Sequence, residues 1–220
     1  MKFGVVLPHF TDNVPSSDFI RRMAIEAEEL GYDHIWVVDH IVVPYPSKWH
    51  SDYGATFYET FSTLGFVIPI TKRVQIGTSV TVLTYRHPLL LAKLFSTVDQ
   101  LSKGRIIAGV GIGSFEEEFQ ALQTSYKTRG KMANETLEIM KQAWTTDGEL
   151  NFKGNYWQFE NTQFAPRPIQ KPHPPIYVAG NTEAGLRRAV EFGEAYHPGI
   201  ASAEEIKSTL NKMKEECEIK

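Results

Sequence analysis

Short apolar runs alternate with stretches of helical periodicity along almost the whole chain. The runs are rich in β-branched residues, which is typical of strands buried on both faces of a parallel sheet. We expect strands at residues 3–7, 34–38, 74–82, 105–110, 176–179 and 194–198. Helix signals lie between them, such as candidate N-cap oxygens in Ser16-Ser17-Asp18 and a proline at the first position of a helix, Pro88. This alternation predicts an α/β fold built from right-handed strand–helix–strand units.

The segment near residues 148–165 breaks this alternation. Aromatic residues alternate there with polar ones, and Lys153-Gly154-Asn155 supplies a turn. This pattern predicts a β-hairpin inserted between two units of the main sheet. We therefore expect a single domain over residues 1–220, with about six strand–helix units and one hairpin insertion.

Composition and charge exclude several classes of function. The chain has 220 residues, of which 42% are hydrophobic, and a net charge of −3. So small a charge favours neither a nucleic-acid partner nor an anionic membrane surface. The single cysteine cannot form an internal disulfide, and no apolar run is long enough to span a membrane. Because the N-terminus has no signal-peptide pattern, we expect a cytoplasmic protein.

Polar residues and glycines follow the expected strands. In a parallel barrel the C-terminal ends of the strands meet at one face, and active sites lie there. Asp39 and His40 follow the second strand, and His197 follows the sixth. The residues after the third, fourth and fifth strands are Thr84, Arg86, His87, Gly111, Gly113, Ser114, Gly180 and Asn181. The spacing therefore predicts a site at this face.

The pair Asp39-His40 is the sharpest signal among these residues. A histidine at a strand end can exchange a proton near neutral pH, and a neighbouring carboxylate can orient it or raise its basicity. We therefore take His40 and Asp39 as candidate catalytic residues. The alternative is that the pair only caps the strand and supports the loop that follows.

The run from Gly109 to Gly113 lies between a strand and a helix, where glycine lets a ligand approach the backbone. The alternative is a tight turn in which Ser114 caps the next helix and Glu117 completes a capping box.

A second candidate ligand site follows the fifth strand. Gly180, Asn181 and Thr182 open a helix there, and the N–H groups of a helix start bind phosphate readily. Arg129 could add a charge-assisted bond to the same phosphate. The alternatives are an ordinary turn and a surface arginine. The histidines do not have the spacing of a metal site, so we expect no catalytic metal.

Several segments in order resemble the luciferase-like monooxygenase superfamily, specifically its deazaflavin-dependent branch. They cover nearly the whole chain and read FGVVLPHF, AEELGYDHIWVVDHI, VQIGTSVTVLTYRHPLLLAK, LSKGRIIAGVGIGSFEEEFQALQ, RGKMANETLEIMKQAWT and FAPRPIQKPHPPIYVAGNTEAGLRRAVEFG. The resemblance implies a TIM-type barrel that binds FMN or coenzyme F420, a 5-deazaflavin, at the C-terminal face of its strands. It also implies that His40 of the Asp39-His40 pair acts in proton transfer.

The resemblance further implies where the cofactor would lie. The third-strand segment would back the cofactor ring, with a non-proline cis peptide between Ser79 and Val80, as relatives have. The glycine turn would lie along the cofactor, and Arg129 matches a phosphate-binding arginine of the luciferases. The implied cofactor-binding residues are Asp39, Thr78, Ser79, Val80, Thr81, Gly111, Gly113, Ser114, Arg129, Gly180, Asn181, Glu183 and Ala184.

Two features depart from the family pattern. The sugar-phosphate dehydrogenases of the deazaflavin branch carry a catalytic acid directly after the glycine turn, where this chain has Ser114. Family members also usually continue through two more strand–helix units, so we expect a shortened barrel. Because an open parallel barrel exposes strand edges, which must be covered, we expect a homodimer.

Three functions are consistent with the sequence. The first is an oxidoreductase that transfers a hydride between coenzyme F420 and a small organic substrate, with His40 exchanging the accompanying proton. The second is a monooxygenase that uses reduced FMN and oxygen, and the third is a non-catalytic flavin-binding protein. A loop over residues 44–56 is rich in aromatic residues and hardly basic, which favours an apolar or aromatic substrate.

Overall fold

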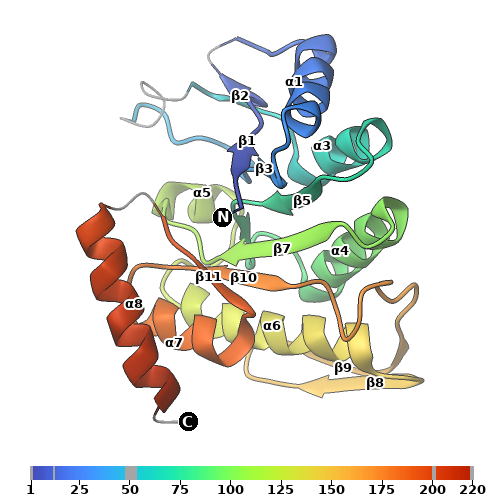
Figure 1. The fold of residues 1–220 in the computed structure, drawn as a ribbon. Coiled ribbons are helices and arrows are strands. Elements are labelled where there is room, and N and C mark those ends of the chain that lie inside the picture. The colour runs from blue at the N-terminus through green and yellow to red at the C-terminus, as the bar shows by residue number, and fades with distance from the viewer. Residues whose placement is uncertain (1, 12, 48–53, 200–201, 219–220) are drawn as a thin grey trace.

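The main element of the fold is a curled parallel sheet. The structure is a computed structural model and describes residues 2–11, 13–47, 54–199 and 202–218. The strands pair side by side in chain order, and every pairing in this sheet is parallel. They are β1 (Gly4–Val6), β3 (His34–Val37), β5 (Gln75–Thr78), β7 (Ile106–Gly111), β10 (Ile176–Ala179) and β11 (Ala195–His197). The predicted parallel α/β fold is therefore confirmed, as a half barrel (Figure 1).

Helices connect the strands and cover the outside of the sheet (Figure 1). Neighbouring helices pack on one another, α3 on α4, α4 on α6, α6 on α7 and α7 on α8. The helices that connect the strands of the sheet thus return the chain so that the next strand starts at the same edge as the one before it. The helices are α1 (Ser17–Glu29), α3 (Thr60–Val67), α4 (Pro88–Ser102), α5 (Glu116–Ala121), α6 (Arg129–Thr145), α7 (Glu183–Phe192) and α8 (Ala203–Glu218).

The helix ends follow the expected local rules. Ser16 is the N-cap of α1, and its hydroxyl accepts a hydrogen bond from the backbone N–H of Phe19 at 3.2 Å. Gly31 follows the last turn of that helix with φ of 87°, a conformation that favours glycine. Pro88 occupies the first position of α4, where its missing N–H removes no intrahelical bond. These features fix where the helices start and stop before tertiary packing is considered.

The core lies between the sheet and its helices. Ile35, Ile76 and Ile106 are in register on adjacent strands, and all three are fully buried. Burying each such side chain contributes about 1.5–3 kcal/mol. Trp144 of α6 is also fully buried, and its indole N–H donates to the carbonyl of Ala92 on α4 at 3.0 Å. The helices are thereby held against the sheet on which the site is built.

Two expected elements are divided in the structure. The expected strand at 74–82 is two strands, β5 and the short β6 (Thr81–Val82), because the chain bends at the Ser79–Val80 peptide before pairing again with β7. The expected helical region at 115–144 is α5 and α6, with a turn between them. Both breaks lie after the C-terminal ends of strands, so they shape the loops of the site.

The hairpin insertion is confirmed, whereas a second small sheet was not expected. Strands β8 (Glu149–Lys153) and β9 (Gln158–Gln163) pair antiparallel. Strands β2 (Phe10–Thr11) and β4 (Thr56–Phe57) also pair antiparallel, above the end of the main sheet. Among the described residues, no helix has the length and apolar character needed to cross a membrane.

Candidate active site

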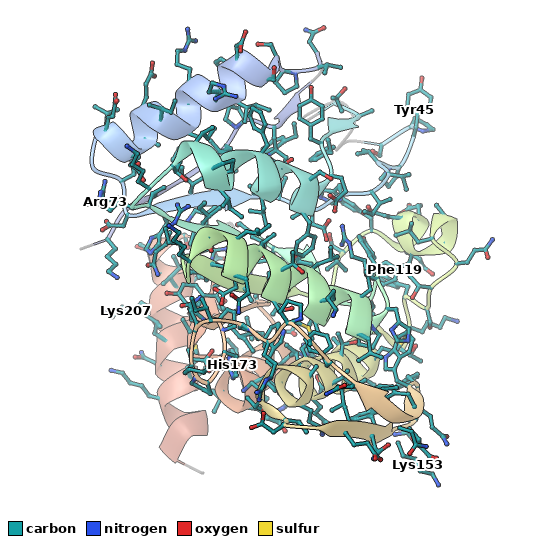
Figure 2. The ribbon with its side chains drawn as sticks, turned by 90° about the vertical axis from the view of Figure 1, so that its right-hand side faces the viewer. Tyr45, Arg73, Phe119, Lys153, His173 and Lys207 are labelled. Carbon is teal, nitrogen blue, oxygen red and sulfur yellow. The ribbon has the colours of Figure 1, made fainter. Side chains whose placement is uncertain are left out.

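The parallel sheet brings the ends of its strands to one edge. Asp39 and His40 follow β3, Ser79 follows β5, and His197 ends β11. Helix α5 and its Phe119 lie at this edge (Figures 1 and 2). Arg73, just before β5, lies on the opposite side of the molecule (Figure 2). The predicted rim is therefore formed by segments far apart in sequence.

Asp39 is bonded to Arg86 and makes no hydrogen bond to His40. Its carboxylate accepts two hydrogen bonds from the guanidinium of Arg86, at 2.8 and 2.9 Å. The hydroxyl of Thr60 and the N–H of Val82 also donate to it, at 2.8 and 2.9 Å. Burial alone would lower the pKa of Arg86, but the hydrogen bonds and negative charges of Asp39 and Glu59 together outweigh burial and raise it. Asp39 thus joins the end of β3 to α3 and β6.

His40 is held by a carboxylate that the sequence analysis did not select. Its Nδ1 lies 2.9 Å from Oε2 of Glu118 on α5. The ring stacks on Phe115 at 5.2 Å and meets the edge of Phe57 at 5.0 Å. Its side chain is 24% exposed, and Nε2 has no hydrogen-bond partner among the described residues. His40 therefore presents at the rim a nitrogen that no described residue contacts by a hydrogen bond.

Glu118 is fully buried and receives four hydrogen bonds. Oε1 accepts the backbone N–H groups of Ile41 at 2.8 Å and Val42 at 3.2 Å. Oε2 accepts the hydroxyl of Tyr85 at 2.8 Å in addition to the bond with His40. Burial alone would raise the pKa of Glu118, but these hydrogen bonds and the positive charge of a protonated His40 together outweigh burial and lower it. Burial, together with the charge of Glu118, raises the pKa of Tyr85, so this hydroxyl remains a donor.

The segment after β5 has the expected unusual backbone. The predicted non-proline cis peptide between Ser79 and Val80 is confirmed. Thr78 and Thr81 are fully buried, whereas Ser79 and Val80 are partly exposed. The hydroxyl of Ser79 lies 2.9 Å from Nε2 of His197. Two of these four predicted residues therefore reach the rim with their side chains, and the threonines lie beneath it.

The glycine turn packs closely against this segment. A Cβ on Gly111 would lie 2.6 Å from the side chain of Val80 and 3.8 Å from Cβ of Ala179. Gly113 has φ of 72°, and its carbonyl accepts a hydrogen bond from Nε of Arg129 at 3.3 Å. The turn is therefore a close junction of three strand ends, and a side chain at Gly111 would open it.

Ser114 does not cap the helix that follows, so this expectation was wrong. Helix α5 begins at Glu116, and its N-cap is Phe115, which makes no side-chain capping bond. The helix starts one residue later than the capping box requires. This shift places Glu118, instead of Glu117, at the third position of the helix, where it is buried against His40. Ser114 is exposed, and its carbonyl accepts the hydroxyl of Tyr126 at 3.3 Å.

The expected phosphate-side residues surround the start of α7. Thr182 is its N-cap, and the hydroxyl accepts the N–H of Gly185 at 3.2 Å. Glu183 and Ala184 are exposed in the first turn, where backbone N–H groups have no intrahelical acceptor. Asn181 is already engaged, because its Oδ1 accepts the hydroxyl of Tyr196 at 3.0 Å.

Gly180 and Arg129 complete this side of the rim. Gly180 has φ of 147°, a conformation that favours glycine. The guanidinium of Arg129 lies 3.6 Å from the ring centre of Tyr126 and donates to the carbonyl of that residue at 2.8 Å. Since Arg129 also contacts Gly113, the structure places this cation beside the glycine turn.

Other features lie away from this rim. A hollow of about 670 Å³ is lined by Thr71, Arg73, Lys103 and Arg105 among others, at the opposite edge of the sheet (Figure 2). Among the described residues, no group of three or more His, Cys, Asp or Glu side chains is arranged to hold a metal ion. At the rim, hydrogen bonds join His40 and Tyr85 to Glu118 and Arg86 to Asp39, all just past the C-terminal ends of strands, so we take the rim as the site.

Fold and site together define a class of protein. A parallel sheet curled into a half barrel, with its polar groups at the C-terminal strand ends, is the scaffold of the α/β-barrel enzymes. A family model described as luciferase-like monooxygenase matches residues 1–218. The chain belongs to the luciferase-like monooxygenase family.

Two groups of curated relatives are similar to the chain. The F420-dependent glucose-6-phosphate dehydrogenase of Amycolatopsis mediterranei is 33% identical over 177 residues, which are 79% of this chain and 50% of that protein. The oxygenase component of the flavin-dependent trigonelline monooxygenase of Acinetobacter baylyi is 31% identical over 152 residues, which are 67% of this chain and 42% of that protein. The chain thus spans about half the length of the curated relatives it matches.

Solved structures show the same two groups. An F420-dependent secondary alcohol dehydrogenase, in complex with an F420-acetone adduct, has a TM-score of 0.85 and 25% identity over 99% of this chain and 64% of its own. The monooxygenase RslO1 of Streptomyces bottropensis has a TM-score of 0.82 and 26% identity over 100% of this chain and 66% of its own. The similarity therefore includes users of a deazaflavin and monooxygenases.

Sequence reasoning missed part of the site. It did not select Glu118, because three consecutive glutamates at a helix start look like a solvated face. Phe119 beside Glu118 and the helical spacing to Leu122 were the available signals that this face is turned inward. Tyr85 and Arg86 follow the third strand, but nothing in the sequence indicated which carboxylate each would meet.

Proposed function

We propose that the protein is an oxidoreductase that transfers a hydride between coenzyme F420 and a small organic substrate. The observation that carries this proposal is the open Nε2 of His40 at the strand-end rim, in a chain that is 33% identical to an F420-dependent dehydrogenase. Hydride transfer to or from a carbon atom is usually accompanied by movement of a proton, and His40 is suited to exchange it.

The described residues fit a flavin-type cofactor. Such a cofactor has a flat ring and a phosphate-bearing tail, so it needs a flat rim with a cation and free backbone N–H groups at one end. The partly exposed Ser79 and Val80 lie beside Gly111, where a side chain cannot be accommodated. The first turn of α7 and Arg129 supply N–H groups and positive charge.

These observations assign a role to each part of the rim. In the proposal, Ser79 and Val80 support the ring, while Thr78 and Thr81 hold the segment from below. Gly111, Gly113 and Ser114 form the wall along the cofactor. Arg129, Gly180, Asn181, Glu183 and Ala184 form the phosphate end. Asp39 acts at a distance from the ring, because its carboxylate is saturated by Arg86, Thr60 and Val82.

The protein's own contribution to the reaction is binding, orientation and proton movement. Coenzyme F420, when bound, supplies the acceptor or donor of the hydride. His40 takes up or releases the proton at Nε2, and the buried Glu118 balances the charge that forms on its ring. Phe57 and Phe115 keep two sides of that ring apolar, which limits its contact with water.

An apolar or aromatic substrate remains our proposal for the reacting molecule. Phe57 and Phe115 provide apolar surface beside His40. Within the segment expected as a loop at 44–56, residues 48–53, including Trp49, lie outside the described residues. We also propose a homodimer, because β1 and β11 form the two edges of the main sheet among the described strands.

An FMN-dependent monooxygenase is the second candidate. It is favoured by the 31% identity to the trigonelline monooxygenase component and by the structural similarity to RslO1. Both candidates use the same rim, and they differ in the cofactor that it holds.

Titration of the purified protein with F420 and, separately, with FMN distinguishes the candidates by fluorescence quenching. We expect F420 to bind at least about tenfold more tightly, a difference of about 1.4 kcal/mol. Tight binding of FMN alone would contradict the proposal and support the second candidate. Binding of neither cofactor would contradict both and support a non-catalytic protein.

A further inference from the structure

We propose that Glu118 is a positioning residue that fixes the tautomer of His40, so that Nε2 is the proton-accepting nitrogen. The tautomer follows from the hydrogen bonds around Glu118 alone. Its consequence for catalysis rests on the proposed function. Among Glu118 and the residues that form hydrogen bonds with it, only His40 was predicted from the sequence to exchange a proton.

The first step is that Glu118 is an ionised acceptor. A carboxylate that is fully buried would favour its neutral form, but three donors besides His40 surround this one, from Ile41, Val42 and Tyr85. Two of them, the backbone N–H groups of Ile41 and Val42, can only donate. The pKa of Glu118 is lowered accordingly, so it stays charged at neutral pH.

The second step concerns the proton on the imidazole. Because an ionised carboxylate only accepts hydrogen bonds, Nδ1 of His40 must carry hydrogen to lie 2.9 Å from Oε2. A neutral imidazole has hydrogen on one nitrogen, so Nε2 has a free lone pair. Nε2 is also the nitrogen without a partner among the described residues. In the direction that reduces the cofactor, the substrate gives its hydride to the cofactor and its proton to Nε2.

The third step is that the arrangement is rigid. Ile41 and Val42 hold Oε1, so the carboxylate cannot rotate without losing both backbone bonds. Phe115 and Phe57 hold the plane of the imidazole from two sides. Glu118 therefore fixes the direction of the ring and the backbone of the two residues that follow His40.

Glu118→Gln gives a defined prediction. The backbone N–H groups of Ile41 and Val42 require an oxygen, so the amide oxygen of the variant should remain at Oε1. Its NH₂ group then faces Nδ1 of His40, which must become the acceptor. The hydroxyl of Tyr85 can rotate to accept the other amide hydrogen. The variant should therefore move the imidazole hydrogen to Nε2, with almost no change of shape.

Long-range ¹H–¹⁵N correlation spectra of ¹⁵N-histidine-labelled protein, without added cofactor, report this tautomer directly. The chain has seven histidines, and a His40→Ala spectrum assigns the His40 signals. We expect the neutral ring of His40 to be in the Nδ1–H form in the wild type and in the Nε2–H form in Glu118→Gln. The Nε2–H form in the wild type, or an unchanged tautomer in the variant, would overturn the proposal. The wild-type result is decisive even if the variant does not fold.

Two further variants separate positioning from general structural damage. Glu117 is exposed and adjacent, so Glu117→Gln makes the same chemical change without touching His40. Tyr85→Phe removes one donor to Oε2 and leaves the bond to Nδ1. Both should keep the Nδ1–H form, and a reversed tautomer in either would contradict the proposed cause.

Activity provides a separate readout. If the proposed function holds, Glu118→Gln should lower kcat by about 10²- to 10⁴-fold with little change in cofactor affinity, the usual range for loss of general base catalysis. An equal loss of cofactor affinity would contradict a positioning role. The two proposals can fail separately. If Glu118→Gln reverses the tautomer of His40 but the wild type turns over no substrate with F420 or FMN, the positioning role of Glu118 stands and only the proposed function is contradicted.

Discussion

Asp39, the residue before His40, forms a two-bond ion pair with Arg86. The distances are 2.8 and 2.9 Å, and the side chains of Asp39 and Arg86 are 0% and 9% exposed. The sequence places Asp39 next to His40, but the structure turns the two side chains to different partners. Adjacent residues thus divide two tasks: Asp39 holds strand ends together, and His40 faces the rim.

Removing one member of this pair should destabilise the fold. We expect Asp39→Ala to lower the free energy of unfolding by about 3–5 kcal/mol, because Arg86 would remain buried with only the half-exposed Glu59 as a carboxylate partner. Urea unfolding measures the loss. The exposed pair Arg22 and Glu26 on α1 is the control, and Arg22→Ala should cost about 0.5 kcal/mol or less. Equal losses in the two variants would contradict the structural role of Asp39.

Glu118 should make stability depend on pH in the acid range. Its pKa is lowered in the folded protein, so its contribution is complete above the ordinary glutamate pKa of about 4.3 and is lost as pH falls through the lower folded value. The wild type should therefore have a higher Tm than Glu118→Gln at pH 7, and the difference should shrink below about pH 4. Thermal unfolding between pH 7 and about pH 4, with Glu117→Gln as control, tests whether this Tm difference shrinks on acidification. A Tm difference that grows on acidification would contradict a lowered pKa of Glu118 in the folded protein.

Two glycines should respond to alanine in opposite directions. A Cβ at Gly109 would lie 1.7 Å from the carbonyl oxygen of Thr78, so Gly109→Ala must force β5 and β7 apart. We expect a loss of about 3 kcal/mol or more in the free energy of unfolding. A Cβ at Gly65, within α3, would meet no atom within 4 Å, so Gly65→Ala should stabilise by about 0.5–1 kcal/mol. Similar changes in the free energy of unfolding for the two variants would contradict the close packing of β5 against β7 at Gly109.

Arg129 should contribute to cofactor affinity. Loss of its charge-assisted bond in Arg129→Ala should raise the Kd of F420 by about ten- to a hundredfold. Lys127 is exposed and two residues away, so Lys127→Ala controls for a general loss of positive charge. Fluorescence titration of both variants gives the comparison. An equal rise in Kd for the two would show that Arg129 acts only through long-range charge.

The fold could be predicted because its determinants are local. Alternating apolar runs and helical stretches define the strand–helix units, and caps such as Ser16 and Pro88 define where helices start. Parallel pairing in chain order then follows from the right-handed connection of such units. The sequence did not predict that the expected strand at 74–82 divides into β5 and β6. Val80, at the break, packs against Gly111 of β7, and such a contact between strands is not visible in the sequence.

The partners within the site could not be predicted from the sequence in the same way. Glu118 lies 78 residues after His40, and their contact depends on where α5 starts. The helix begins at Glu116, after an N-cap at Phe115 that makes no side-chain capping bond. A shift of one residue in a helix start turns a different side chain inward. Strand order brings His40 and α5 to one edge, but only packing decides which glutamate reaches the imidazole.

The most direct test of the central claim is turnover with F420 by the wild type and by His40→Ala. Absorbance of the cofactor follows hydride transfer, and a separate titration follows its binding. We predict that His40→Ala lowers turnover by about 10²- to 10⁴-fold and leaves the Kd of F420 almost unchanged. Turnover by His40→Ala equal to that of the wild type would contradict the proposed role of His40 in proton transfer.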